Sequence, residues 1–329
     1  MRKNLLSACL IFITINAMCQ TINYIPYYHL VNRAKLVECI DANYDSAIVY
    51  YSQAFAIVDY VLAEQLRDFI RCAIMLENDN LVYFAMDKCI EQTVPLSTLF
   101  HFTSDSLVDK YKNTEEGRKY YTVEQENKEK YIEKYINPPH KKILDSLSVS
   151  DITVRKKWRK GSFFYRRFPN SKKTQELLRE WKIVDSCNRL VLDEMIKKYD
   201  FPNERNGLFN NPNFIIGGGG IVLVHYDDSV FFKDIEYKML IEGKLFPDYY
   251  AFRAHRIVSI YNLPKTDYTF FYSERQSKKM TTEEKAQVDK NRYRIGLPSV
   301  EEEIIIKQCN RHIRLESQKE TKKKEAQKK

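Results

Sequence analysis

Apolar residues in the first third of the chain recur at helical spacing. In NYDSAIVYYSQAFAI, small and aromatic residues alternate at steps of three or four: Tyr44, Ala47, Tyr51 and Ala54. A similar set, Val82, Met86 and Cys89, stands 35 residues after Ala47, Tyr51 and Ala54. Apolar residues also indicate the helix before the second set, because Phe69, Ile70 and Ala73 follow Leu66 by three, four and seven residues. The pattern therefore predicts amphipathic helices that repeat as pairs.

Small residues at these positions let two helices approach closely, while aromatic residues fill the groove between them. In this respect residues 24 to 92 resemble tetratricopeptide repeats, although they lack the Trp and Pro of the full consensus. An ordinary pair of helical hairpins is the alternative. Two repeats cannot bury their own faces, so we expect them to pack on the segments that follow. We expect residues 20 to 92 to form this repeat domain and to bind another protein.

The rest of the chain also predicts helices. Residues 93 to 139 hold two or three more, ended by Pro138-Pro139, and are expected to link two domains. We expect a second domain over residues 140 to 275 and a charged helical tail over residues 276 to 329. Only 9 glycines and 10 prolines in 329 residues leave little of the turn chemistry that an all-β chain needs. The predicted fold class is mainly α, with tetratricopeptide-like helical hairpins followed by a second, mostly helical domain.

The N-terminus has the three parts of a secretory signal peptide. Arg2 and Lys3 form a basic start, Leu5 to Ile15 an apolar core, and Ala17-Met18-Cys19 a small-x-small cleavage site. The core is shorter than the roughly 20 residues that span a bilayer, and no second long apolar run follows, so we expect no transmembrane segment. We predict that residues 1 to 19 are removed and that the mature protein is periplasmic or secreted. A lipid anchor on a cysteine is the competing interpretation.

Export changes the interpretation of the cysteines, because disulfides form outside the cytoplasm. Five of the seven remain after cleavage: Cys39, Cys72, Cys89, Cys187 and Cys309. Five is odd, so at least one is unpaired, and the absence of a CxxC spacing excludes a thioredoxin-like motif and a zinc ribbon. Cys72 and Cys89 lie in apolar helical patterns and are expected to be small core residues, with a bridge between them as the alternative.

The formal charge of +9 is unevenly distributed. Without Arg2 and Lys3 it is +7, of which the last twelve residues, QKETKKKEAQKK, carry +4. Residues 155 to 173, RKKWRKGSFFYRRFPNSKK, are rich in Lys and Arg, contain no acidic residue and interleave five aromatics. In a cytoplasmic protein this stretch would indicate a nucleic-acid interface, but the signal peptide argues against nucleic acid as a partner. We expect a mobile basic loop, and contact of this stretch and the tail with an anionic surface is the sharper hypothesis.

Four segments of the second domain follow one another in a characteristic order: LDSLSVSDITVR, WKIVDSCNRLVLDEMIKKYDFP, IVLVHYDD and YYAFRAHRIVSIYNLP. Over residues 140 to 272 this order resembles an uncharacterised domain family of exported bacterial proteins. That family's pattern runs Asp-Gln with an Arg nearby, Asp-x-x-Asn, Gln-His-Ala-Asp, Asp-Arg and Tyr-Gly-Thr-Gln. The matching positions are Asp151, Arg155, Asp185, Asn188, His225, Asp227 or Asp228, and Arg256. The resemblance implies a shared polar site without an established activity. The departures at Ile152, His255 and Phe270-Phe271 imply that part of any catalytic centre is lost.

Two of these matches carry a simple helical argument. Asp185 and Asn188 are three residues apart on a predicted helix, so both can project toward one neighbour. Arg256 lies in an apolar helical pattern, where a guanidinium usually meets a carboxylate. A structural Asp–Arg pair that holds two helices in register is the plainer interpretation. The sharper one is a ligand carboxylate or phosphate held by Arg155 and Arg256, with Asp151 as a further ligand-binding candidate.

His225 is the candidate general base, because a neutral histidine oriented by Asp185 or Asp227 can accept a proton near neutral pH. His225, Asp185 and Asn188 are therefore the catalytic candidates. Four glycines, Gly217 to Gly220, precede this histidine, but no Gly-Lys-Ser/Thr follows, and a dinucleotide fingerprint would need glycine where Val222 stands. No HExxH motif supports a metal site built on His225. We expect a flexible glycine loop with no cofactor and no metal.

Two classes of function remain open. In the first, the protein is an exported interaction or adaptor module whose second domain has a structural polar core. In the second, the C-terminal domain is an enzyme or binds a small ligand through the polar residues named above. The departures from the family pattern favour the first class.

Overall fold

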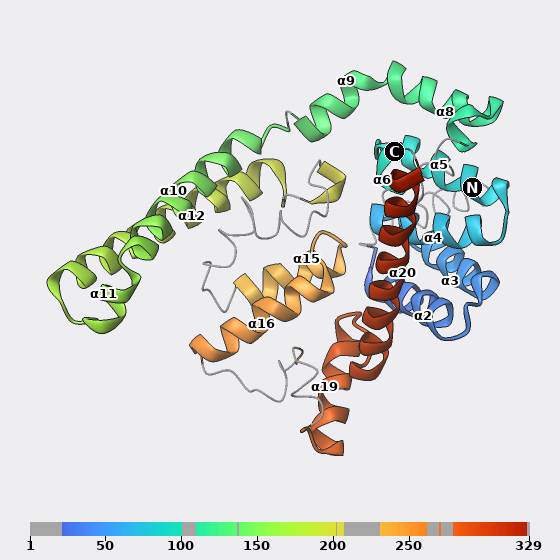
Figure 1. Cartoon of the computed structure of the whole chain (residues 1–329). Helices are drawn as coiled ribbons and strands as arrows, with labels where there is room; N and C mark the ends of the chain where they lie inside the picture. Colours follow the sequence, from blue (N-terminus) through green and yellow to red (C-terminus); the bar gives the residue numbers. More distant parts are fainter. Residues whose placement is uncertain are drawn as a thin grey trace, which may run out of the picture.

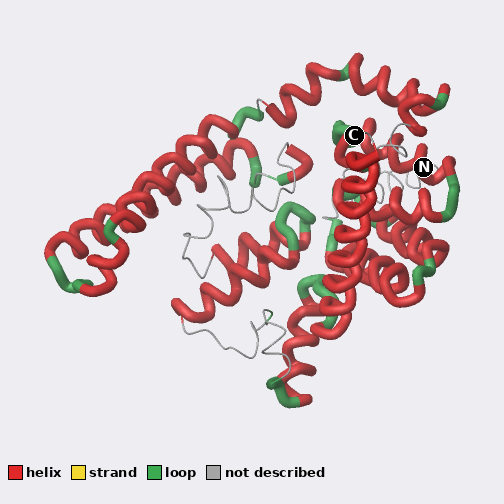
Figure 2. The backbone as a smooth tube through the Cα atoms, viewed as in Figure 1, coloured by secondary structure: helices red, strands yellow, loops and turns green. Residues whose placement is uncertain are grey.

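The computed structural model describes residues 22–100, 110–136, 138–201, 203–206, 231–261, 270 and 279–327. These residues are mainly helical and include no strand (Figure 1), as Figure 2 shows by colour. The mainly α prediction is therefore confirmed. Within the same residues, no helix is both long enough and apolar enough to cross a membrane. The signal peptide, the four glycines and His225 lie outside the described residues.

Residues 25–91 form two helix pairs. The pairs are α2 (Ile25–Asp41) with α3 (Tyr44–Ala56), and α4 (Ala63–Met75) with α5 (Asp79–Glu91). Asn43 and Asn78 cap α3 and α5, because each side-chain oxygen accepts a hydrogen bond from a first-turn N–H, at 3.0 and 3.3 Å. Ala47 and Ala54 are fully buried, as their spacing predicts. Membership in the tetratricopeptide class stays a prediction.

The stretch expected to be a linker packs against the second helix pair. It contains α6 (Leu96–Leu99), α8 (Glu115–Glu126), α9 (Lys128–Tyr131) and the π-helical turn η1 (Ile132–Ile136). A Glu124 carboxylate oxygen accepts a hydrogen bond from the Leu96 N–H at 2.8 Å. The rings of Tyr83 and Tyr120 stack with centroids 5.8 Å apart. These contacts attach α6 and α8 to each other and to α5.

Two long helices form a hairpin. They are α10 (Lys141–Lys160) and α12 (Lys172–Tyr199), joined by the short helix α11 (Ser162–Arg167). Figure 1 shows this hairpin extending away from the rest of the molecule, with α11 at its far end. At the base of the hairpin, four apolar residues join the main core: Leu144, Leu147, Leu192 and Met195.

The prediction of a mobile loop over residues 155–173 is wrong, because most of this stretch is helical. The Tyr165 ring lies against Gly161, where a β-carbon would overlap it, and stacks on Trp158 with centroids 5.2 Å apart. Ser171 caps α12 by accepting a hydrogen bond from the Thr174 N–H at 3.2 Å. Ring packing and capping therefore fix a turn for which charge alone indicated a loop.

The last third of the chain packs against the N-terminal helices. Its helical segments are η2 (Glu204–Asn206), η3 (Phe231–Glu236), α15 (Tyr237–Ile241), α16 (Pro247–Tyr261), α19 (Thr282–Arg294) and α20 (Val300–Gln327). The helix α20 lies against α2, and a disulfide joins Cys39 to Cys309 with Cα atoms 5.6 Å apart. The alternative bridge between Cys72 and Cys89 is wrong, because both are buried free thiols.

Two glycines let tyrosines of the N-terminal region pack on C-terminal turns. Gly243 and Gly296 have φ angles of 69° and 81°, a region in which other residues are strained. The ring of Tyr24 lies over Gly243 and that of Tyr28 over Gly296, so close that a β-carbon would overlap each. As a result, one continuous buried cluster includes residues from both ends of the described chain.

Candidate functional site

Four of the six predicted site residues lie on the α10–α12 hairpin, and two of them, Asp151 and Asn188, are buried. Asp151 of α10 is 2% exposed and forms an ion pair with Arg155 one turn later, at 2.6 Å. Asn188 of α12 is 7% exposed, and its side-chain oxygen is 2.7 Å from the Ser150 hydroxyl. The same hydroxyl is 2.8 Å from the Leu147 carbonyl. Asp151 and Arg155 are therefore paired within one helix, and a serine and an asparagine make a polar contact between the two helices.

Burial decides the electrostatics of Asp151. It raises the pKa of this carboxyl above its ordinary value, although the neighbouring Arg155 guanidinium acts in the opposite direction. Asp151 is paired with Arg155 and buried in the hairpin, so a substrate has little access to its carboxyl group. The geometry assigns Asp151 and Asn188 to the packing of the hairpin.

The other predicted residues lie elsewhere on α12, on α16 or outside the described residues. Asp185 is half-buried on α12, three residues before Asn188. Arg256 belongs to α16, but its side chain is outside the described part, as is the whole of His225. His255, which replaces the expected aspartate, is exposed on α16.

A buried guanidinium on α16 belongs to Arg253, three residues before Arg256. Arg253 is fully buried and is paired with Glu236 of η3, with Nε 3.0 Å and Nη2 3.0 Å from the same carboxylate oxygen. Burial raises the pKa of Glu236, and Arg253 opposes this shift. The sequence held the signal, because Arg253 has the helical spacing of buried Tyr249, Tyr250 and Ile257. The pairing of Arg256 itself stays a prediction, because its side chain is outside the described part.

Sequence reasoning also missed Glu204, the most enclosed single carboxylate near the repeat helices. One of its oxygens accepts hydrogen bonds from the Ala63 N–H at 2.6 Å and from the Tyr60 hydroxyl at 3.3 Å. Ala63 is the first residue of α4, whose own N-cap residue Leu62 has no capping side chain. Glu204 therefore caps α4 from 141 residues away. Such a distant partner leaves no local pattern in the sequence.

Two groups with pKa values near neutral pH, Glu204 and Lys134, interact electrostatically near this cap. Burial raises the pKa of Glu204 to about 7, with the Ala63 N–H, Tyr60 and Lys134 opposing the shift. Burial also lowers the pKa of Lys134 to about 8, and Glu204 opposes that shift. Lys134 donates to the Gln92 carbonyl at 2.6 Å and lies 5.4 Å from the Tyr60 ring centre. Perturbed pKa values also occur at enzyme sites, but every polar contact named here serves packing between segments.

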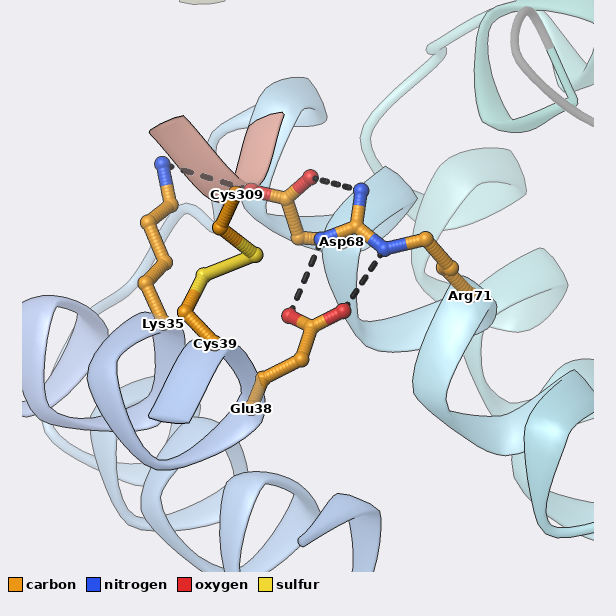
Figure 3. Close-up of a disulfide and its surroundings, with 6 residues drawn as sticks. All are labelled: Lys35, Glu38, Cys39, Asp68, Arg71 and Cys309. Carbon is orange, nitrogen blue, oxygen red and sulfur yellow. Dashed lines mark hydrogen bonds and ion pairs between the residues drawn. A yellow bond between two sulfur atoms is a disulfide. The ribbon is translucent and has the colours of Figure 1, made fainter. Parts of the chain in front are cut away.

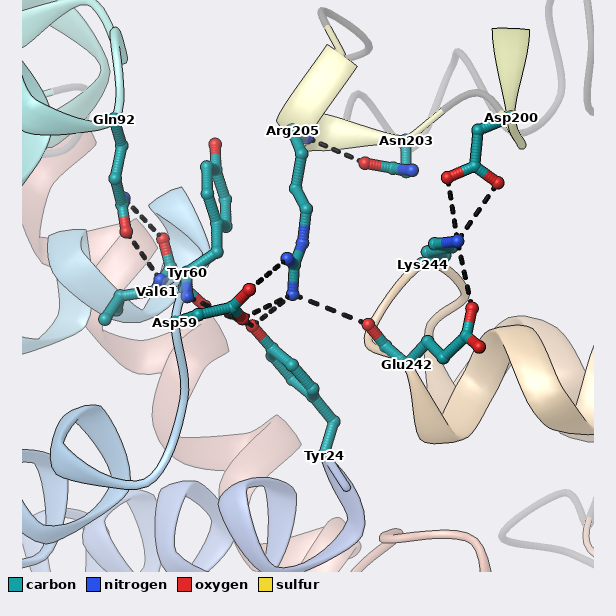
Figure 4. Close-up of polar contacts among 10 residues, drawn as sticks. All are labelled: Tyr24, Asp59, Tyr60, Val61, Gln92, Asp200, Asn203, Arg205, Glu242 and Lys244. Atoms are coloured by element: carbon teal, nitrogen blue, oxygen red, sulfur yellow. Dashed lines mark hydrogen bonds and ion pairs between the residues drawn. The ribbon is translucent and has the colours of Figure 1, made fainter. Parts of the chain in front are cut away.

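Arg205, the next residue, ties the repeat region to α15 (Figure 4). Its guanidinium donates to both Asp59 carboxylate oxygens, at 2.7 and 2.8 Å, and to the Tyr24 hydroxyl at 2.5 Å. The Tyr24 hydroxyl in turn donates to the Tyr60 carbonyl at 2.7 Å. Nearby, Lys244 forms an ion pair with Asp200 at 2.7 Å. The hydrogen bonds of Arg205 in η2 therefore connect regions that are distant in sequence.

A second group of charges lies beside the disulfide, between α2 and α4 (Figure 3). Arg71 donates to both Glu38 oxygens at 2.8 and 2.9 Å and also to Asp68 at 3.2 Å. Lys35 completes the group, with its ammonium 3.3 Å from Asp68. Burial raises the pKa of Asp68, but Lys35 and Arg71 outweigh burial, so the net pKa is lowered. Opposite charges are matched throughout the group, which is typical of a structural network.

A third group of side chains is exposed to solvent instead of buried between segments. At the tip of the hairpin, Phe163 is 83%, Phe168 51% and Phe164 39% exposed. Arg166 and Arg167 are exposed between them and, with Ser162 and Phe163, line an open depression. No group of three potential metal ligands occurs in the described ranges. The tip of the hairpin, at α11, therefore exposes aromatic and cationic side chains.

The chain matches no protein-family model, no curated protein and no solved structure.

Proposed function

We propose that this protein is an exported adaptor, in which the helical body is a scaffold and its projecting surfaces bind partners. The observation that carries the proposal is the tip of the α10–α12 hairpin, where three phenylalanines are exposed beside arginines. Large apolar side chains that stand in solvent mark interaction sites when they cluster. The buried positions of Asp151 and Asn188 support a scaffold over a catalyst.

The adaptor has two partners in this proposal. The tip binds an anionic surface, because residues 155–173 contain no acidic residue. The repeat helices bind another protein. Since α20 lies against α2, the partner surface is on α3, where Val49, Ser52 and Gln53 are exposed. The lysine-rich tail is the alternative contact for the anionic surface.

Photo-crosslinking tests the protein contact. A crosslinking amino acid in place of Val49 on α3 is expected to give a discrete adduct in intact cells, because this position faces the proposed partner. The matched control is Ile183 on α12, which is equally exposed at 54% against 53% for Val49. Equal labelling from both positions, or none from Val49, contradicts a partner on the repeat helices.

Export is part of the proposal, and the disulfide between Cys39 and Cys309 supports it, because such bonds persist outside the cytoplasm. We expect the native mature chain to start at Gln20, after the small-x-small site. Intact-mass spectrometry of the protein purified from its natural host measures this. An N-terminal Met1, or a lipid mass on Cys19, contradicts export as a lipid-free protein.

A further inference from the structure

We infer that the hairpin tip, residues 156–173, docks on an anionic phospholipid bilayer and inserts Phe163 and Phe168 among the lipid headgroups. The inference rests on the proposed contact with an anionic surface and names the chemistry of that surface. Three features of the tip carry it: a rigid support, a net positive charge and an exposed apolar edge.

The tip is a built element. Tyr165 is 8% exposed and stacks on Trp158, which meets Trp181 of α12 at 5.9 Å between ring centroids. The Thr174 hydroxyl donates to the Phe168 carbonyl at 2.8 Å. The same packing that buries Tyr165 leaves Phe163 83% exposed. Exposed phenylalanines that cluster on one folded turn mark a site for an apolar partner outside the chain.

The charge around these rings has one sign. Eight Lys and Arg side chains in the tip are exposed: Lys156, Lys157, Arg159, Lys160, Arg166, Arg167, Lys172 and Lys173. The tip contains no Asp or Glu, and the nearest carboxylates with a described contact are on α12, where Glu180 pairs with Lys157 and Glu176 is 4.0 Å from Lys172. Basic residues near an anionic bilayer add attraction that falls off within a Debye length.

The combination favours a bilayer over a soluble polyanion. A sulfated or phosphorylated polymer satisfies the cations but offers no apolar phase to Phe163 and Phe168. A bilayer surface offers both, because phenylalanine enters the headgroup and acyl boundary while Lys and Arg stay with the phosphates. The open depression between Phe163, Arg166 and Arg167 has the lining that a lipid phosphate requires.

The shape of the hairpin suits a flat surface. A helix of 20 residues such as α10 is about 30 Å long. Since only the base of the hairpin joins the main core, α11 stands clear of the body (Figure 1). A planar bilayer can therefore reach the tip without colliding with the repeat helices.

Vesicle co-sedimentation of the full mature protein tests the inference. The probes are vesicles of phosphatidylglycerol mixed with phosphatidylcholine, vesicles of phosphatidylcholine alone, and soluble heparin. We expect binding to the anionic vesicles only, and a loss of about tenfold or more in the double variant Phe163→Ser/Phe168→Ser. Arg166→Gln/Arg167→Gln is expected to lose about tenfold and to reduce the salt dependence.

Matched controls keep the test specific. Ile183→Ser/Leu190→Ser removes exposed apolar residues elsewhere on the hairpin, and Lys322→Gln/Lys323→Gln removes the same charge from the tail. Both controls should bind within about twofold of wild type if binding needs the tip. All substituted tip residues are exposed, so circular dichroism should show an unchanged helical signal.

Tryptophan fluorescence reports insertion, because both tryptophans of the chain, Trp158 and Trp181, are in the hairpin. Lipids brominated near the headgroup should quench the bound wild type more than the phenylalanine variant. If the phenylalanine variant binds anionic vesicles as tightly as wild type, bilayer insertion is overturned. If wild type binds heparin tightly and only the arginine variant loses this binding, the bilayer inference is wrong, but the proposed contact with an anionic surface is retained. Failure of wild type to bind either probe overturns both proposals.

Discussion

At the scale of single residues, Glu204 is where folding and protonation are most directly coupled. Its carboxyl is buried, caps α4 and has a pKa of about 7, against an ordinary value near 4.5. Between these values the unfolded chain releases a proton that the folded chain retains. The folded state therefore loses stability as pH rises through this window, and the loss is complete above the folded pKa.

The variant Glu204→Gln tests this coupling. Glutamine keeps an oxygen for the Ala63 N–H and has no charge to bury, so the pH-dependent loss should disappear. We expect the free energy of unfolding to exceed that of wild type by about 1 to 3 kcal/mol near pH 7.5, and by much less near pH 5. Urea denaturation at both pH values measures it. A gain of equal size at both values would show that Glu204 is ionised throughout, and that burial does not control its pKa.

At the scale of elements, the α10–α12 hairpin shows how a helix pair uses polar residues to fix its register. Asn188 meets Ser150 across the pair, while Asp151 and Arg155 are paired along α10. Near the base, Leu147 and Leu192 supply apolar contact. Polar groups that are buried together cost stability when one partner is removed, so they specify one alignment of the helices.

Truncation of the asparagine should reveal this role. We expect Asn188→Ala to lower the free energy of unfolding by about 1 to 2 kcal/mol, because the buried Asn188 side chain and its hydrogen bond with the half-buried Ser150 hydroxyl are lost. Leu190→Ala, on the same helix but 65% exposed, is the control and should change stability by about 0.5 kcal/mol or less. Chemical denaturation of the three proteins measures both effects. An Asn188→Ala protein as stable as the control would place Asn188 outside the structural core of the hairpin.

At the scale of the whole molecule, the C-terminal region closes against the N-terminal helices. Tyr28 packs on Gly296, the Asn32 amide donates to the Gly296 carbonyl at 2.9 Å, and the disulfide joins α2 to α20. The bond connects residues 270 positions apart. Closing so long a loop removes much of the conformational freedom of the unfolded chain.

Removal of the disulfide should therefore be costly. We expect Cys39→Ser to lower the free energy of unfolding by about 2 to 5 kcal/mol under oxidising conditions. Cys187→Ser changes an exposed free thiol and is expected to leave the melting temperature unchanged. Thermal unfolding with and without a reductant measures both, and reductant should bring wild type to the level of Cys39→Ser. A wild-type melting temperature that does not change with reductant would contradict a stabilising disulfide between Cys39 and Cys309.

The sequence by itself determined the helices and their buried faces where the pattern was local. Ala47 and Ala54 are buried as their three- and four-residue spacing predicts, since neighbours on a helix face are close in sequence. Asp151 and Arg155 are also paired one turn apart on α10, a local contact that was not predicted. The sequence pattern failed for residues 155–173, because the turn depends on the Tyr165 ring packing on Gly161 rather than on composition.

Only the tertiary structure decided which distant residues meet. The partner of Cys39 is Cys309, the cap of α4 is Glu204, and the buried arginine of α16 is Arg253, paired with Glu236. Hydrophobic periodicity says which face of a helix is buried, but it does not say which segment covers that face. Those partners follow from how the helices pack, and that depends on contacts such as Tyr24 on Gly243 that join positions far apart in the chain.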